Sequence, residues 1–151
     1  METLIIRTGR QGFVMADHIL FLGPNRIGIS KTIDKEDTQI HTGIEILAQA
    51  GALHVRYLTS LVKHAFLLKI QHVKAQKSCL EPGFYRAWGT LVSQSKQAYA
   101  YDLFAEKDGE TRIEGRFLFA LGDYDHHFRK DILESHYRNL FSCLKNDMPN
   151  D

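Results

Sequence analysis

This chain of 151 residues has few of the features that assign a protein quickly to a class. It has two cysteines, Cys79 and Cys143, which lie far apart and form no paired motif. Free thiols are therefore expected, and a disulfide lacks support. No stretch reaches about 18 consecutive apolar residues, so no transmembrane helix is expected. Residues 1–10 lack the layout of a signal peptide, which makes the cytoplasm the expected location.

The charge and composition are equally unremarkable, and this limits the partners that the chain is expected to have. The formal net charge is +1 and the hydrophobic content is 44%, as in an ordinary soluble globular protein. Neither nucleic acid nor an anionic membrane surface is indicated as a partner. The length suits one domain over residues 1–151 with a single hydrophobic core.

Residues 41–62 form the most apolar stretch, and their pattern predicts the central element of the fold. A helix that is hydrophobic on every side is a buried helix. Glu45 and Gln49 lie four residues apart in this stretch and therefore on one face of the helix. A carboxylate near the start of a buried helix needs a reason. One structural reason is a capping box, with Thr42 as N-cap and Glu45 three residues later.

The remaining segments read mainly as strands, which predicts an α+β fold. Two strands precede the helix and are separated by a turn at residues 23–25, and four more follow it in a meander. After the last strand, the helical spacing of apolar residues predicts an amphipathic helix over about residues 127–145. The helix is expected to end near residue 63, and the strands are expected at residues 13–21, 26–33, 66–75, 84–94, 97–106 and 111–121.

Within the helix, residues 43–50 read Gly-Ile-Glu-Ile-Leu-Ala-Gln-Ala, which resembles the helix signature of hotdog-fold acyl-thioester enzymes. The resemblance is to β-hydroxyacyl-acyl carrier protein dehydratases of the FabA/FabZ type, and most of all to the ApeP group of aryl polyene and xanthomonadin pathways. Residues 14–24 and 70–83 resemble the family's strands and turns on either side of the helix. The resemblance covers residues 13–122 and implies a hotdog fold, in which an antiparallel sheet wraps around a long central helix.

The resemblance also implies an activity. It indicates a 3-hydroxyacyl-[acyl carrier protein] dehydratase-like protein of fatty acid or polyketide biosynthesis, which eliminates water from a thioester of acyl carrier protein or coenzyme A. Glu45 would act as the acid and His41 as the base, with Gln49 orienting the reacting groups and Gly43 making a backbone contact at the helix entrance. No cofactor is expected, and no metal either, because His41 and Glu45 have ligand spacing but no third ligand.

One departure from the family pattern leaves the reaction open. The family's catalytic histidine lies in a His-Phe-Pro-Gly loop about 14 residues before the acid, but this chain has Lys31 there and a shorter loop. A hotdog thioesterase using Glu45 needs no histidine at that position, and a non-catalytic acyl-binding subunit needs neither group. We expect a homodimer, because a second copy would cover the exposed side of the apolar helix. The acyl tunnel would lie along the helix at the dimer seam, with His54 and Arg56 at its contacts or rim, and residues 127–145 could dock a partner enzyme.

Overall fold

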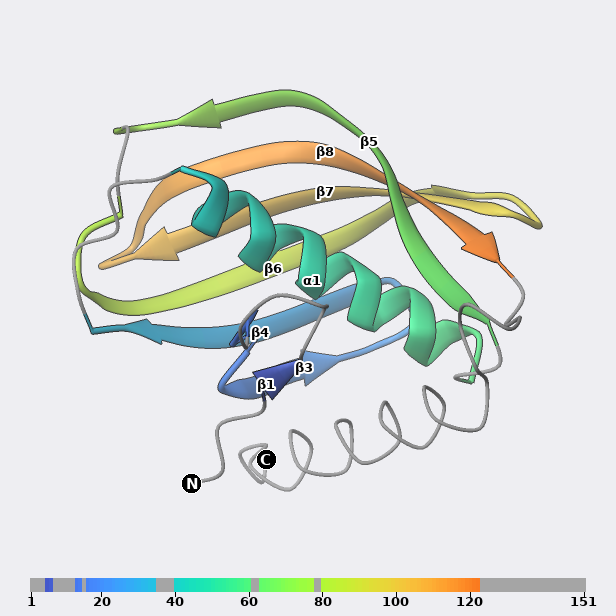
Figure 1. Cartoon of the computed structure of the whole chain (residues 1–151), viewed down its shortest axis with the longest axis horizontal. Coiled ribbons are helices and arrows are strands. Elements are labelled where there is room, and N and C mark those ends of the chain that lie inside the picture. Colours follow the sequence, from blue (N-terminus) through green and yellow to red (C-terminus); the bar gives the residue numbers. More distant parts are fainter. Residues whose placement is uncertain are drawn as a thin grey trace.

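A computed structural model describes residues 5–6, 13–14, 16–34, 40–60, 63–77 and 80–122. At its centre lies one helix, α1 (His41–Leu58), which crosses one face of a curved antiparallel sheet (Figure 1). A short pair of strands near the N-terminus stands apart from this sheet: β1 (Ile5–Ile6) and β2 (Phe13–Val14). The main sheet contains β3 (His18–Leu22), β4 (Arg26–Ile33), β5 (His64–Ala75), β6 (Gly83–Gln94), β7 (Ala98–Lys107) and β8 (Glu110–Gly122).

The strand order in this sheet is β3-β4-β6-β7-β8-β5. The chain therefore forms β3 and β4 at one side, passes through α1, and starts again with β5 at the opposite edge. The meander from β6 to β8 then fills the space between them. As a result, β3 and β5 are the two edge strands of the described sheet.

The core forms where the inward side chains of the strands meet the helix. Along β7 and β8, buried apolar residues that face α1 alternate with more exposed residues on the other face, as in a half-solvated sheet. Gly51 allows an especially close approach, because a Cβ there would lie 2.6 Å from the ring of Phe119 on β8. The largest fully buried side chains are Tyr85, Tyr101, Phe117, Phe119, Ile19, Ile27, Ile29, Leu47, Leu53, Leu103 and Ile113.

The structure confirms most of the predicted strands. The strand predicted over residues 26–33 is β4, and the four strands predicted after the helix each begin and end within two residues of the expected positions. The expected four-strand meander is wrong for β5, which pairs with β8 and not with β6. The hairpin between β7 and β8 turns through Asp108 and Gly109, with φ of 54° and 75°. Positive φ at both central residues is the pattern of a type I′ turn, which matches the twist of the flanking strands.

The first predicted strand, residues 13–21, is wrong as a single element. Residues 13–14 form β2, which pairs with β1, and β3 begins only at His18. The Asp17 carboxylate explains part of the interruption, because its Oδ2 accepts the backbone N–H of Thr32 at 2.7 Å. A side chain thus takes a donor on β4 that a continuous strand would have bonded through its backbone.

Both predicted ends of the helix also need correction. Ile40 is the N-cap, its side chain has no oxygen to cap the helix, and Thr42 is already the second helical residue, so the capping box with Glu45 does not form. At the other end, α1 stops at Leu58 rather than near residue 63. Ser60 adopts a left-handed φ of 53°, which ends a helix in the manner of an αL cap.

Two further expectations lie beyond the described residues. The amphipathic helix over about residues 127–145 and the extent of the single domain past residue 122 fall outside them. Within the residues that are described, no helix is both long and apolar enough to cross a lipid bilayer.

Candidate functional site

Glu45 and Gln49 form the polar feature that interrupts the apolar surface of α1. The Gln49 Nε2 donates a hydrogen bond to Glu45 Oε1 at 2.5 Å, as their spacing of four residues predicted. Gln49 is only 7% exposed, whereas Glu45 is half-buried. Among the described residues, Glu45 has no other hydrogen-bond or ion-pair partner. Its carboxylate is therefore bound neither to a cation nor to the helix N-terminus, which leaves it available for proton transfer.

The N-terminus of α1 lies one turn before Glu45 and offers backbone donors. The first amide that bonds within this helix is that of Ile44, to the Ile40 carbonyl at 3.2 Å. The amides of His41 and Gly43 therefore have no acceptor within the helix, and the helix dipole favours negative charge near them. A polarised carbonyl oxygen is the kind of group that such donors bind.

His41, the predicted base, is the exposed first residue of α1. It shares a face with Glu45, but no hydrogen bond joins the two side chains in the described part of the chain. Gly43, the predicted backbone contact, is buried, and a Cβ there would lie 3.1 Å from Ile113 Cδ1 and 3.5 Å from Leu80 Cδ1. Packing against the sheet therefore accounts for a glycine at this position.

Lys31 occupies the position that resembles that of the family's histidine. It lies opposite Tyr85 in the register of β4 and β6, and Tyr85 is one of the fully buried side chains. The Lys31 amine pairs with the Asp17 carboxylate at 3.6 Å, and both side chains are mostly shielded from solvent. The Lys31 amine is therefore already paired with the carboxylate of Asp17.

His54 was expected at a dimer contact or rim, and this prediction is wrong, because His54 is fully buried. Its Nε2 donates to the carbonyl of Gly23 at 2.7 Å, since a carbonyl can only accept, and its Nδ1 accepts the Tyr101 hydroxyl at 2.6 Å. Burial lowers the pKa of His54, and the hydrogen bond to Gly23 opposes this effect. The neutral ring thus joins α1 to β7 and to the β3–β4 turn.

The same expectation is wrong for Arg56, which is also buried in this chain. Its Nη2 donates to the carbonyl of Ala65 at the start of β5, at 3.4 Å. The polar character of both residues suggested exposure, but hydrogen-bond partners inside the fold offset part of the cost of burying them.

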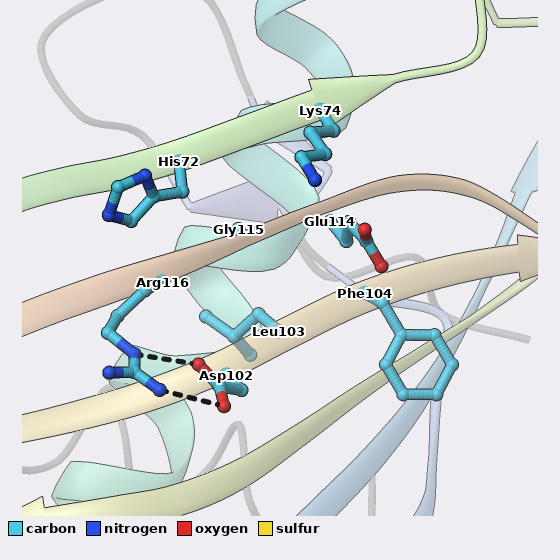
Figure 2. A pocket seen from close by; sticks show the side chains of 8 residues that line it. All are labelled: His72, Lys74, Asp102, Leu103, Phe104, Glu114, Gly115 and Arg116. Carbon is cyan, nitrogen blue, oxygen red and sulfur yellow. Dashed lines mark hydrogen bonds and ion pairs between the residues drawn. The ribbon is translucent and has the colours of Figure 1, made fainter.

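A cavity lies elsewhere, on the sheet face that points away from the helix (Figure 2). Its volume is about 440 Å³, and it opens widely to solvent. Two of its charged side chains form an ion pair, in which Arg116 donates two hydrogen bonds of 2.8 and 3.1 Å to Asp102. No sequence motif marked this groove, since its residues come from three strands. They are His72, Lys74, Asp102, Leu103, Phe104, Glu114, Gly115 and Arg116.

Comparisons with known proteins bear on the fold rather than on the sequence family. No protein-family model matches the sequence, and no curated protein matches it. The dehydratase heterocomplex ApeI:P from Xenorhabdus doucetiae matches with a TM-score of 0.61 at 13% identity, over 76% of this chain and 86% of that one. A thioesterase from Haemophilus influenzae matches with a TM-score of 0.62 at 13% identity, over 72% and 80%.

A third similar structure is a hypothetical thioesterase with coenzyme A from Streptococcus pneumoniae. It has a TM-score of 0.58 at 11% identity and covers 70% of this chain and 85% of that one. Identities this low establish the fold alone. Together with the six-stranded sheet and single helix, they confirm the hotdog fold that the resemblance implied.

Proposed function

We propose that this chain acts on acyl thioesters through Glu45, as a 3-hydroxyacyl-[acyl carrier protein] dehydratase-like protein. The observation that carries the proposal is the half-buried Glu45 carboxylate, whose partner among the described residues is the neutral amide of Gln49. Structural neighbours that are described as a dehydratase and as thioesterases support the general class of substrate. The proposed substrate is therefore a thioester of acyl carrier protein or of coenzyme A.

In the dehydration, a base removes the proton from C2 of the 3-hydroxyacyl thioester, and Glu45 gives its proton to the C3 hydroxyl. The C3–O bond breaks, the C2–C3 double bond forms and water leaves. We assign the base to His41, one turn before Glu45. The backbone amides of His41 and Gly43 at the start of α1 would bind the thioester carbonyl and stabilise the charge that develops on its oxygen.

Thioester hydrolysis is the second candidate, and the surroundings of Lys31 favour it. A dehydratase of the family type needs a histidine where this chain has a lysine that is paired with Asp17. Hydrolysis needs only the Glu45 carboxylate, which would take a proton from water as the water attacks the thioester carbonyl. The C–S bond then breaks, and the thiol leaves with that proton.

A product assay separates these candidates. The purified protein is incubated with 3-hydroxyacyl and with saturated acyl thioesters of coenzyme A and of acyl carrier protein. A 2-enoyl product supports dehydration, and release of free thiol from the saturated substrate supports hydrolysis. If neither product forms while acyl carrier protein still binds, the chain is a non-catalytic subunit and the enzymatic proposal is wrong.

We also propose that the chain forms a homodimer through β5, which would place an acyl tunnel along α1 at the dimer seam. The 12-residue β5 lies at the edge of the sheet, and its Leu68 is 65% exposed. A long edge strand with exposed apolar side chains needs a cover in a soluble protein. A second β5 would supply one by antiparallel pairing.

The variant Leu68→Asp tests this interface. Two added carboxylates at a symmetric contact repel each other and lose apolar burial, so we expect dimer dissociation to become at least about tenfold easier. Analytical ultracentrifugation over a concentration series measures this. Val92, which is 45% exposed on the interior strand β6, provides the matched control Val92→Asp. A wild-type chain that is monomeric, or an equal effect of both variants, would remove β5 as the interface.

A further inference from the structure

The side of α1 that faces away from the sheet is buried within a single chain. Gly51 and His54 mark the side toward the sheet, because the first packs against β8 and the second binds a tyrosine of β7. With about 3.6 residues per turn, Gln49 and Arg56 lie about 180° from them around the helix. Yet Gln49 is 7% exposed and Arg56 is 6% exposed. A layer other than the sheet therefore covers this side of α1.

The covering layer belongs to the chain itself. The described elements that pack most closely on α1 are β4, β5, β6, β7 and β8, which all belong to one sheet. A helix with its side chains is about 10 Å wide, so a sheet on one side buries that side and the flanks but not the opposite side. The burial is present in one chain without a second copy beside it. A dimer partner is therefore not needed to explain it.

The chain leaves the sheet beside the C-terminal end of α1. Gly122, the last residue of β8, pairs with His64, the first residue of β5. The Arg56 Nη2 donates to the carbonyl of the next residue, Ala65, at 3.4 Å, so Gly122 lies near the last turns of the helix. Residues 123–125 then read Asp-Tyr-Asp. Carboxylates at this point would offset part of the cost of burying the Arg56 guanidinium.

The pattern and length of residues 127–145 fit the covered side of α1. As a helix, this segment would be about 28 Å long, and α1 with its 18 residues is about 27 Å long. Residues 123–126 suffice for the reversal, because helix–helix connections of about two to eight residues are common. The segment would carry one apolar stripe, formed by Leu133, Tyr137, Leu140, Phe141 and Leu144.

We propose that residues 127–145 form a helix that packs in cis, antiparallel to α1, against the side that carries Gln49 and Arg56. The apolar stripe then faces α1, while Ser135 and Ser142 face solvent. The end of the segment lies beside the first turns of α1, where Glu45 is half-buried. An apolar face turned toward α1 is part of the core and is not available to dock a partner enzyme. This inference does not depend on the proposed activity.

Disulfide trapping in the full chain tests this arrangement. Cys79 and Cys143 are first replaced by alanine. Ala52 lies on the covered side of α1, three residues from Gln49, and the equal lengths of the two helices place Leu133 opposite it. The pair Ala52→Cys with Leu133→Cys should close at least about tenfold faster than Ala52→Cys with Ser135→Cys, which is the matched control on the opposite face.

The rates are read from mass spectra of mixed isotope-labelled and unlabelled chains, which separate bonds within a chain from bonds between chains. Equal rates for the two pairs, or bonds mainly between chains, would overturn the inference. Hydrogen exchange of the wild-type protein gives a readout without any substitution. The amides of residues 130–145 should exchange at least about tenfold more slowly than in an unfolded chain.

Exchange of these amides at the unfolded rate would overturn the inference. Protection that persists in both cysteine variants while the bond between positions 52 and 133 fails to form would also overturn it, because the segment would then pack elsewhere.

Discussion

Replacing Glu45 with glutamine will lower the kcat for the acyl thioester by about 10²- to 10⁴-fold, the usual contribution of a general acid or base. The amide can neither give nor take the proton in either proposed reaction. It can still accept the hydrogen bond from Gln49, because its carbonyl oxygen takes the place of Glu45 Oε1. The fold should therefore survive, and thermal unfolding of Glu45→Gln should resemble that of the wild type. Steady-state kinetics on whichever thioester is turned over measures the effect.

Glu114→Gln is the matched control for this experiment. Glu114 lies on β8 in the 440 Å³ groove, on the sheet face away from α1, and is exposed. The same change there should leave kcat within about twofold of wild type, because surface substitutions outside a site have small effects. If Glu114→Gln abolished turnover and Glu45→Gln did not, the groove and not the helix would carry the chemistry.

The second large effect is a loss of stability in acid. Burial, and then the positive charge of Arg56, lowers the pKa of His64 from 6.5 to about 4. Below pH 6.5 the unfolded chain binds a proton at this residue before the folded chain does, so the free energy of unfolding falls as the pH drops toward 4. From about pH 7.5 to about pH 5, His64 alone should remove about 2 kcal/mol. His54, whose pKa burial also lowers, acts in the same direction.

Urea unfolding at the two pH values measures this loss. The variant His64→Gln has no proton to gain at this position, so its stability should fall by about 2 kcal/mol less than that of wild type over the same range. The same substitution at His72, which is exposed on β5, is the control. Equal losses in His64→Gln and in wild type would show that the histidine is accessible to protons in the folded chain.

Hydrophobic alternation was a reliable guide to the sheet because it acts locally. The strands β6, β7 and β8 alternate between a face toward α1 and a face toward solvent, and turn residues such as Gly109 separate them. The order of the strands across the sheet was not predicted: the expected four-strand meander is wrong for β5, because the helix connection places β5 at the far edge beside β8. The periodicity along the chain does not contain that information.

Features that depend on side-chain partners distant in sequence could not be predicted. His54 reads as a rim residue until Gly23 and Tyr101, 31 and 47 positions away, are seen to satisfy both of its nitrogens. The capping box does not form although Thr42 and Glu45 have the right spacing, because the helix starts two residues too early for Thr42 to be the N-cap. In both cases the local pattern admitted two structures, and tertiary contacts selected one.

The candidate site lies between these extremes. The shared helix face of Glu45 and Gln49 follows from helix geometry and was predicted, and the structure adds a hydrogen bond between them. The partner of Lys31 could not be anticipated, because Asp17 lies 14 positions earlier and belongs to an interrupted strand. The roles of His41 and Gly43 stay proposals, since they depend on a substrate and on a second subunit.

The most direct test of the central claim is a crystal structure of the protein with an acyl pantetheine thioether, which mimics the thioester but cannot react. The acyl chain should lie along α1, with the carbon that replaces the thioester carbonyl about 3–4 Å from the Glu45 carboxylate, a distance at which proton transfer or attack by a held water is feasible. A ligand bound in the groove between His72 and Arg116, with Glu45 untouched, would contradict it.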